Sequence, residues 1–155
     1  MIAIMSPRNK AIREIKYMLY NHNKIDKLIE QRKEELIDGM NLSNAAWLRG
    51  INRESNTFED VIANFDEDWK IKRYKHWKDF LRNLFAIFKN IESSKYYKFL
   101  QFKYFEELSS EEILNKMNIT EEELKVLAYQ FNCIVYQYAI KDKLFKEEVQ
   151  NSVAV

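Results

Sequence analysis

Apolar residues recur at every third or fourth position over most of the chain, with charged residues between them. This period is typical of α-helices that bury one face. Ser6 and Pro7 favour a helix start. A Ser side chain accepts hydrogen bonds from the free N–H groups of the first turn, and Pro fits in that turn because no N–H is needed there. The first helix is predicted to begin there and to end near Tyr20, with Ile12, Ile15 and Leu19 as its buried positions.

A second helix is predicted after the polar break Asn21–Asn23. Its apolar face begins at Ile25 and ends at Ile37, and Gly39 is the expected C-terminal cap. The pattern leaves open whether these two segments form an α-hairpin or one kinked helix. Residues 40–56 are polar and lack a sustained period, so a linker or mobile loop is predicted there.

A long helical stretch is predicted from the capping pair Thr57 and Asp60 as far as Ile91. The acidic run Asp66–Asp68 divides it into two helices in this interpretation. Ser93 and Ser94 then cap a helix that ends near Glu106.

Two capping boxes follow in close succession, Ser109 with Glu112 and Thr120 with Glu123. The first begins a short helix and the second a helix that is predicted to continue to about Val149. The predicted buried stripe of this last helix consists of Leu124, Leu127, Phe131, Ile134 and Tyr138.

Composition narrows the fold class to all-α. The 155 residues include only two Gly and one Pro, and neither Gly39 nor Gly50 lies in a phosphate-binding or nucleophile-elbow motif. The single Cys133 excludes a disulfide framework, and no apolar run reaches the ~20 residues of a membrane helix. We expect a cytoplasmic protein without membrane contact, organised as an N-terminal helical segment (1–40), a linker (41–56) and a helical domain (57–150).

The segment Leu100–Phe131, LQFKYFEELSSEEILNKMNITEEELKVLAYQF, has the order helix, turn, short helix, turn, longer helix. It resembles the promoter-reading fourth region of bacterial sigma factors. The matching positions are Leu100, Tyr104, Ser109, Glu112, Ile113, Met117, Ile119 and Thr120. With its N-terminal helices, the whole chain resembles phage transcriptional regulators of the RinA/ArpU type.

The resemblance implies a helical bundle with a C-terminal helix-turn-helix at about 96–135 that binds double-stranded promoter DNA. It implies DNA contacts by Thr120, Lys125, Tyr129 and Gln130. RNA polymerase or another host protein and a homodimer are further expected partners, and no cofactor is expected. A basic cluster on the preceding helix adds three candidate phosphate contacts, Lys70, Arg73 and Lys78.

Two features depart from that family and favour another class of function. Glu121–Glu123 occupy the start of the recognition helix, and residues 93–140 carry five Lys against seven Glu, a net charge of −2. A second apolar stripe contains Val126, Tyr129, Cys133 and Tyr136. The alternative is therefore a phage-encoded protein-binding module, or an inhibitor of a host enzyme or defence complex, with Val126, Tyr129 and Tyr136 at the interface.

The sequence offers no constellation for catalysis or for metal binding. His22 and His76 are the only histidines, and neither has carboxylates or a second histidine at metal-ligand spacing. Cys133 lies among apolar residues and is interpreted as an inert thiol. We expect a protein that is not an enzyme.

Overall fold

The computed structural model describes residues 6–47, 62–91 and 94–146, and the regular elements of these residues are all helices. The all-α prediction is confirmed for this part of the chain. Contacts divide the chain into two units, which we call the α1–α7 unit (Met1–His22 with Asp79–Val155) and the α2–α4 unit (Asn23–Lys78). The helix α4 (Trp69–Lys89) contributes residues to both units.

The first helix of the α1–α7 unit is α1 (Pro7–Tyr20), capped by Ser6, whose hydroxyl accepts a hydrogen bond from the N–H of Asn9 at 3.1 Å. This start and this end are as predicted. The buried side chains of α1 are Ala11, Ile15, Met18 and Leu19. Since α2 begins separately at Ile25, the two predicted N-terminal helices are distinct.

The helix α2 (Ile25–Trp47) is longer than predicted. The expected C-terminal cap at Gly39 was wrong, because the helix continues through this residue for two further turns. One glycine lowers helix stability by only about 1 kcal/mol relative to alanine, a cost that a helix of 23 residues can accommodate. Residues up to Trp47, which the prediction assigned in part to the linker, thus belong to α2. The remaining linker residues, 48–56, and the capping pair Thr57 and Asp60 lie outside the described residues.

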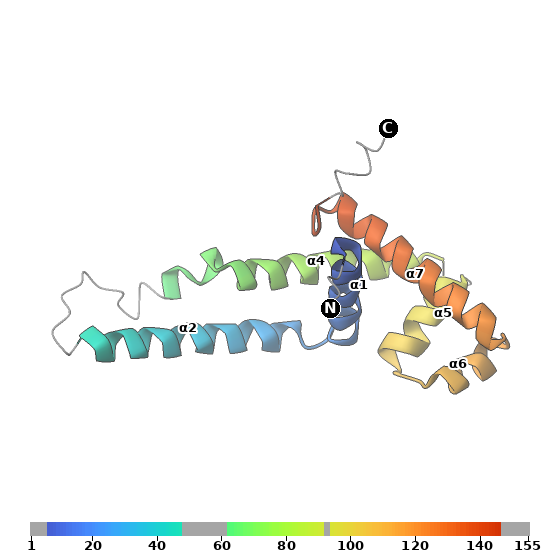
Figure 1. The fold of residues 1–155 in the computed structure, drawn as a ribbon, viewed down its shortest axis with the longest axis horizontal. Coiled ribbons are helices and arrows are strands. Elements are labelled where there is room, and N and C mark those ends of the chain that lie inside the picture. The colour runs from blue at the N-terminus through green and yellow to red at the C-terminus, as the bar shows by residue number, and fades with distance from the viewer. Residues whose placement is uncertain (1–5, 48–61, 92–93, 147–155) are drawn as a thin grey trace, which may run out of the picture. The chain divides into compact units, whose positions relative to one another are not determined.

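In the α2–α4 unit, α2 and the first part of α4 run antiparallel, as Figure 1 shows. Asp26 near the start of α2 pairs with Lys78, whereas Arg32 one to two turns later pairs with Asp68 just before α4. The predicted break at Asp66–Asp68 is confirmed, since the 3₁₀ turn η1 (Phe65–Glu67) precedes α4. Buried residues of this unit are Ile25, Ile29, Ile71 and Trp77.

The core of the α1–α7 unit is centred on Phe131 of α7 (Glu121–Lys141), which is fully buried. Its ring stacks on Phe88 of α4 at 5.5 Å between centroids and on Tyr104 at 5.9 Å, and meets Phe99 edge-on at 5.1 Å. Burial raises the pKa of the Tyr104 phenol above its usual range. Phe99 belongs to α5 (Lys95–Leu100), and Tyr104 to the π-helical turn η2 (Gln101–Phe105).

The path from α5 to α7 agrees with the capping signals in the sequence. Ser94 caps α5 through its hydroxyl, Ser109 begins α6 (Ser110–Met117), and Thr120 begins α7. In Figure 1, α5, η2, α6 and the first half of α7 follow one another at one end of this unit.

The end and the buried stripe of α7 differ from the prediction. The helix ends at Lys141 and a turn with Lys143 at φ 63° follows, so the predicted end near Val149 was wrong. Ile134 and Tyr138 are half-buried, and the stripe instead continues through Val135 and Ala139. The buried positions advance by three and then repeatedly by four residues, which follows the 3.6-residue helical period as α7 passes from α5 to α1.

Candidate functional site

The outer side of the first half of α7 is the candidate functional surface. Tyr129 is 68% exposed and Val126 55% exposed, and Glu121, Glu122 and Lys125 are exposed beside them. On the inner side of the same turns, Leu124 and Leu127 are buried. The helix therefore presents an aromatic ring, an aliphatic side chain and mostly negative charge to its surroundings.

The turn between α6 and α7 is held by local hydrogen bonds. Asn118 takes the left-handed conformation (φ 55°, ψ 52°) that ends α6, a conformation in which Asn is one of the better-tolerated residues. The N–H of Ile119 donates to the carbonyl of Leu114 at 3.2 Å. In the capping box that follows, the N–H of Glu123 donates to Thr120 Oγ1 at 3.1 Å, and the N–H of Thr120 donates to Glu123 Oε1 at 3.4 Å.

The same reciprocal arrangement begins α6. The N–H of Glu112 donates to Ser109 Oγ at 3.2 Å and the N–H of Ser109 donates to Glu112 Oε1 at 3.1 Å. The latter bond lowers the pKa of Glu112 from its usual value. Both capping boxes predicted from the sequence are confirmed, and together they fix where α6 and α7 begin.

The four predicted DNA-contacting residues of α7 occupy three different settings. Lys125 and Tyr129 are exposed on the outer side. Thr120 is exposed, but its hydroxyl serves the capping box and also donates to Glu123 Oε1 at 3.1 Å. Gln130 is half-buried, and its Oε1 accepts a hydrogen bond from the Tyr96 hydroxyl at 3.2 Å. Lys125 and Tyr129 are thus the two with side chains directed to solvent.

The predicted partner interface requires one correction. Val126 and Tyr129 share the outer side of α7, but Tyr136 is only 6% exposed and lies in the interior. The guanidinium carbon of Arg8 lies 5.3 Å from the centroid of the Tyr136 ring. Tyr136 lies two turns after Tyr129 on the same side of α7. The contact of α1 with α7 covers this side at Tyr136 but leaves it exposed at Tyr129. Tyr136 therefore does not belong to the candidate surface.

The other three predicted DNA contacts belong to the α2–α4 unit, in a region rich in ion pairs. Lys78 Nζ lies 2.8 Å from Asp26, and the neighbouring Lys72 and Lys75 pair with Glu67 and Asp66. Lys70 lies over the ring of Trp69 at 5.7 Å, and Arg73 is also engaged in an interaction. Because carboxylates compensate much of the positive charge, these residues form a mixed surface rather than a uniformly basic one.

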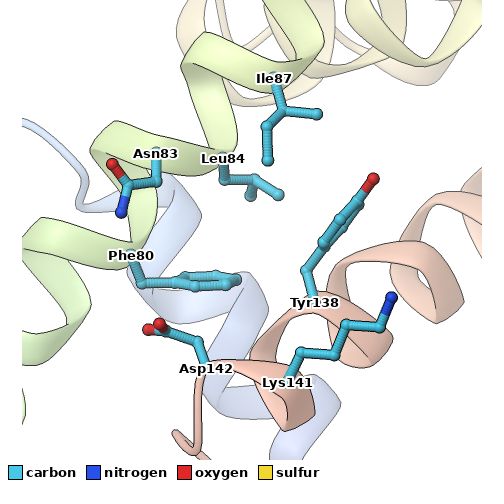
Figure 2. A pocket seen from close by; sticks show the side chains of 7 residues that line it. All are labelled: Phe80, Asn83, Leu84, Ile87, Tyr138, Lys141 and Asp142. Carbon is cyan, nitrogen blue, oxygen red and sulfur yellow. The ribbon is translucent and has the colours of Figure 1, made fainter.

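The described residues of the α1–α7 unit line two hollows that bear on the candidate surface or on the end of α7. One, of about 310 Å³, lies between α7 and the segments that begin α5 and end α6, and its apolar lining includes Met117, Ile119 and Val126. The other, of about 210 Å³, lies between α4 and the end of α7 (Figure 2). Figure 2 shows Phe80, Leu84 and Ile87 of α4 facing Tyr138 of α7, with Lys141 and Asp142 at the edge. The second hollow is smaller than the 300–1,000 Å³ usual for small-molecule sites.

Sequence reasoning missed two features near α7. Arg8 donates from Nη2 to Cys133 Sγ at 3.0 Å, so the half-buried thiol faces a guanidinium. Residues Met117 and Ile119 contribute to the larger hollow, although the sequence identified them only as family positions. No local pattern in the sequence indicates the hollow, because it forms where α5, the end of α6 and α7 come together.

Among the residues that the structure describes, no group of three or more His, Cys, Asp or Glu side chains is arranged to hold a metal ion. Within the same ranges, no helix has the length and apolar character that crossing a membrane requires. Comparisons of the chain with protein-family models, with curated proteins and with solved structures found no match.

Proposed function

We propose that this chain is a transcriptional regulator, and not an enzyme, that binds promoter DNA through a helix-turn-helix made of α6 and α7. The observation that carries the proposal is the arrangement of α6 and α7, which are joined by a left-handed turn at Asn118 and each begin with a capping box. The first half of α7 is exposed on its outer side. In the helix-turn-helix proteins, this is the helix that enters the major groove.

Lys125 and Tyr129 are the residues that we assign to DNA contact. Both are exposed on the outer side of α7, where one ammonium and one phenol are able to reach a phosphate or a base edge. Lys116 on α6 lies 5.5 Å from the centroid of the Phe102 ring. The three glutamates at the start of α7 oppose phosphates, so we expect weak binding whose decrease with rising salt reflects only the few contacts between lysine and phosphate.

The test is fluorescence anisotropy with a labelled duplex from the region upstream of the protein's own gene, at low and at high salt. We expect binding at micromolar protein in low salt and several-fold weaker binding by Lys125→Glu. The matched control is Lys16→Glu, which makes the same charge change at an exposed position of α1. Absence of binding at micromolar protein in low salt would overturn the proposal, because even sequence-independent binding is expected there.

A second candidate function, a protein-binding module built on this fold, is favoured by one specific observation. Val126 and Tyr129 expose a branched aliphatic and an aromatic side chain next to each other, with Glu121 and Glu122 around them. Exposed aromatic anchors are typical of protein interfaces, whereas carboxylates disfavour a polyanion. The partner in this case would be a host protein such as RNA polymerase, an enzyme or a defence complex.

Affinity capture from host lysate tests this second function. We expect specific partners to be retained by the wild-type protein and by Tyr17→Ala, a control at a tyrosine that is 50% exposed on α1. The double variant Val126→Asp with Tyr129→Ala is expected to lose them. An unchanged set of captured proteins in the double variant contradicts a partner surface on α7.

A further inference from the structure

The larger hollow on the α1–α7 unit is lined by both apolar and acidic side chains. Met117 and Ile119 come from the end of α6 and the turn, and Val126 comes from α7. Glu122 and Glu123 line the side formed by the first turn of α7, and both are exposed. The lining thus offers apolar side chains and the carboxylates of Glu122 and Glu123 to a ligand, with Lys95 as its one cationic residue.

Local hydrogen bonds set the walls of this hollow. The capping box of Thr120 fixes the first turn of α7, and the bond from the N–H of Ile119 to the carbonyl of Leu114 fixes the turn before it. At the far end, the hydrogen bond from Tyr96 to Gln130 joins α5 to α7. A site with walls held in this way loses little conformational entropy when a ligand binds.

We propose that this hollow binds a short amphipathic helix of a partner protein that carries lysine or arginine beside an apolar stripe. The α7 wall from Glu122 to Gln130 is ~12 Å long at 1.5 Å per residue, which matches about two turns of a bound helix. One or two apolar side chains at helical spacing would pack against Met117 and Val126. Basic side chains next to them would meet Glu122 and Glu123.

Charge complementarity selects this partner over nucleic acid. The carboxylates of Glu122 and Glu123 attract cationic side chains and repel phosphates, and the apolar side chains of the lining form no hydrogen bonds with a sugar–phosphate backbone. Lys95 also lies at the hollow and lies 5.3 Å from the Tyr96 ring centroid. It offers a contact for an acidic group or a carbonyl of the same bound segment. This inference rests on the second candidate function, and not on DNA binding.

The experiment is a fluorescence-polarisation titration of the full chain with two labelled synthetic peptides of about four helical turns. Both peptides carry leucines on one face, and the other face carries lysines in the first peptide and glutamates in the second. We expect the lysine peptide to bind and the glutamate peptide to bind at least about tenfold more weakly.

The matched variants are Glu122→Lys and Glu121→Lys. Both reverse one exposed charge in the first turn of α7, but only Glu122 lines the hollow. We expect Glu122→Lys to weaken the lysine peptide about tenfold and Glu121→Lys to weaken it much less. Val126→Ala is expected to weaken both peptides while leaving the circular dichroism spectrum unchanged, because Val126 is exposed.

Equal affinity for the two peptides, equal effects of the two charge reversals or no binding of the lysine peptide would each overturn the inference.

A parallel titration with labelled duplex DNA distinguishes failure of this inference from failure of the proposed functions. If nucleic acid occupies this flank of α7, Glu122→Lys strengthens DNA binding and the lysine peptide fails to bind. If Tyr129→Ala alone abolishes the capture of host partners but the lysine peptide does not bind, the second function stands and the assignment of the hollow is wrong.

Discussion

The guanidinium of Arg32 holds the carboxylate of Asp68 through two hydrogen bonds, from Nε to Oδ2 at 2.9 Å and from Nη2 to Oδ1 at 2.8 Å. Asp68 also caps α4, because its Oδ2 accepts bonds from the N–H groups of Lys70 and Ile71 at 3.1 Å each. The side chains are only 20% and 10% exposed. One carboxylate therefore both begins α4 and links it to α2.

Asp68→Ala is expected to lower the free energy of unfolding of the α2–α4 unit by about 2–3 kcal/mol, since it removes a helix cap and the less exposed of the two carboxylates, Asp68 and Glu35, that pair with the Arg32 guanidinium. Urea unfolding followed by tryptophan fluorescence measures this, because Trp47, Trp69 and Trp77 all belong to that unit. The control is Asp66→Ala. Asp66 pairs with Lys75 at 2.6 Å in an exposed setting, so no measurable change is expected. Equal losses in the two variants would contradict the role of Asp68.

The same pair predicts a pH dependence of stability. The hydrogen bond from Arg32, aided by the N–H of Ile71, lowers the pKa of Asp68 from its usual value, although partial burial opposes the shift. A carboxyl group with a lowered pKa in the folded state stabilises the fold at pH above its unfolded pKa of about 3.9. That contribution is lost as the pH falls through the lower, folded pKa.

Wild-type protein and Asp68→Asn should therefore differ most in urea midpoint at neutral pH and converge in strongly acidic solution. Tryptophan fluorescence at a series of pH values measures the two curves. A constant difference across the acid range would show that the effect of Asp68 does not come from its charge.

Local signals in the sequence predicted much of the fold. Ser6, Ser109 and Thr120 each cap the helix that follows them, because a capping side chain bonds to a backbone N–H only two or three residues away. The all-α class followed from the helical period and from the scarcity of Gly and Pro. These features depend on neighbouring residues and are therefore visible in the sequence.

The parts that sequence reasoning did not find depend on residues far apart in the chain. Asp68 was seen only as part of an acidic break, since its partner Arg32 lies 36 positions away. Tyr136 was placed on an outer stripe because helical spacing gives no information about where α1 covers α7. In the basic cluster, the partner Asp26 of Lys78 lies 52 positions away, so the local excess of lysine overstated the positive charge.

Gly39→Ala is expected to stabilise the α2–α4 unit by up to about 1 kcal/mol, because Gly39 lies inside α2 and a Cβ added there meets no atom within 4 Å. The readout is again the urea midpoint from tryptophan fluorescence. Gly39→Pro is the opposite control and should destabilise by about 3 kcal/mol if the helix is continuous there. A destabilising Gly39→Ala would instead support the helix end that the sequence alone suggested.

Thr120→Ala is expected to lower the stability of the α1–α7 unit by about 1 kcal/mol, because it removes the hydroxyl of the α7 capping box. Thr120→Ser retains the hydroxyl and should behave nearly as the wild type. Thermal unfolding followed by far-UV circular dichroism compares the two. If Thr120→Ser is as unstable as Thr120→Ala, the methyl group and not the cap carries the effect.

Tyr129→Ala and Tyr136→Ala test which side of α7 is open. Tyr136→Ala should destabilise by about 3 kcal/mol, because the ring is buried against Arg8 and lies 6.2 Å from that of Phe145 between centroids. Tyr129→Ala should leave the unfolding temperature within the error of the wild type, since its ring is mostly in solvent. Circular dichroism melts of both variants decide this. A large loss of stability on removing Tyr129 would mean that the outer side of α7 packs inside the fold, and a helix sequestered in that way offers neither DNA nor a partner protein a surface to bind.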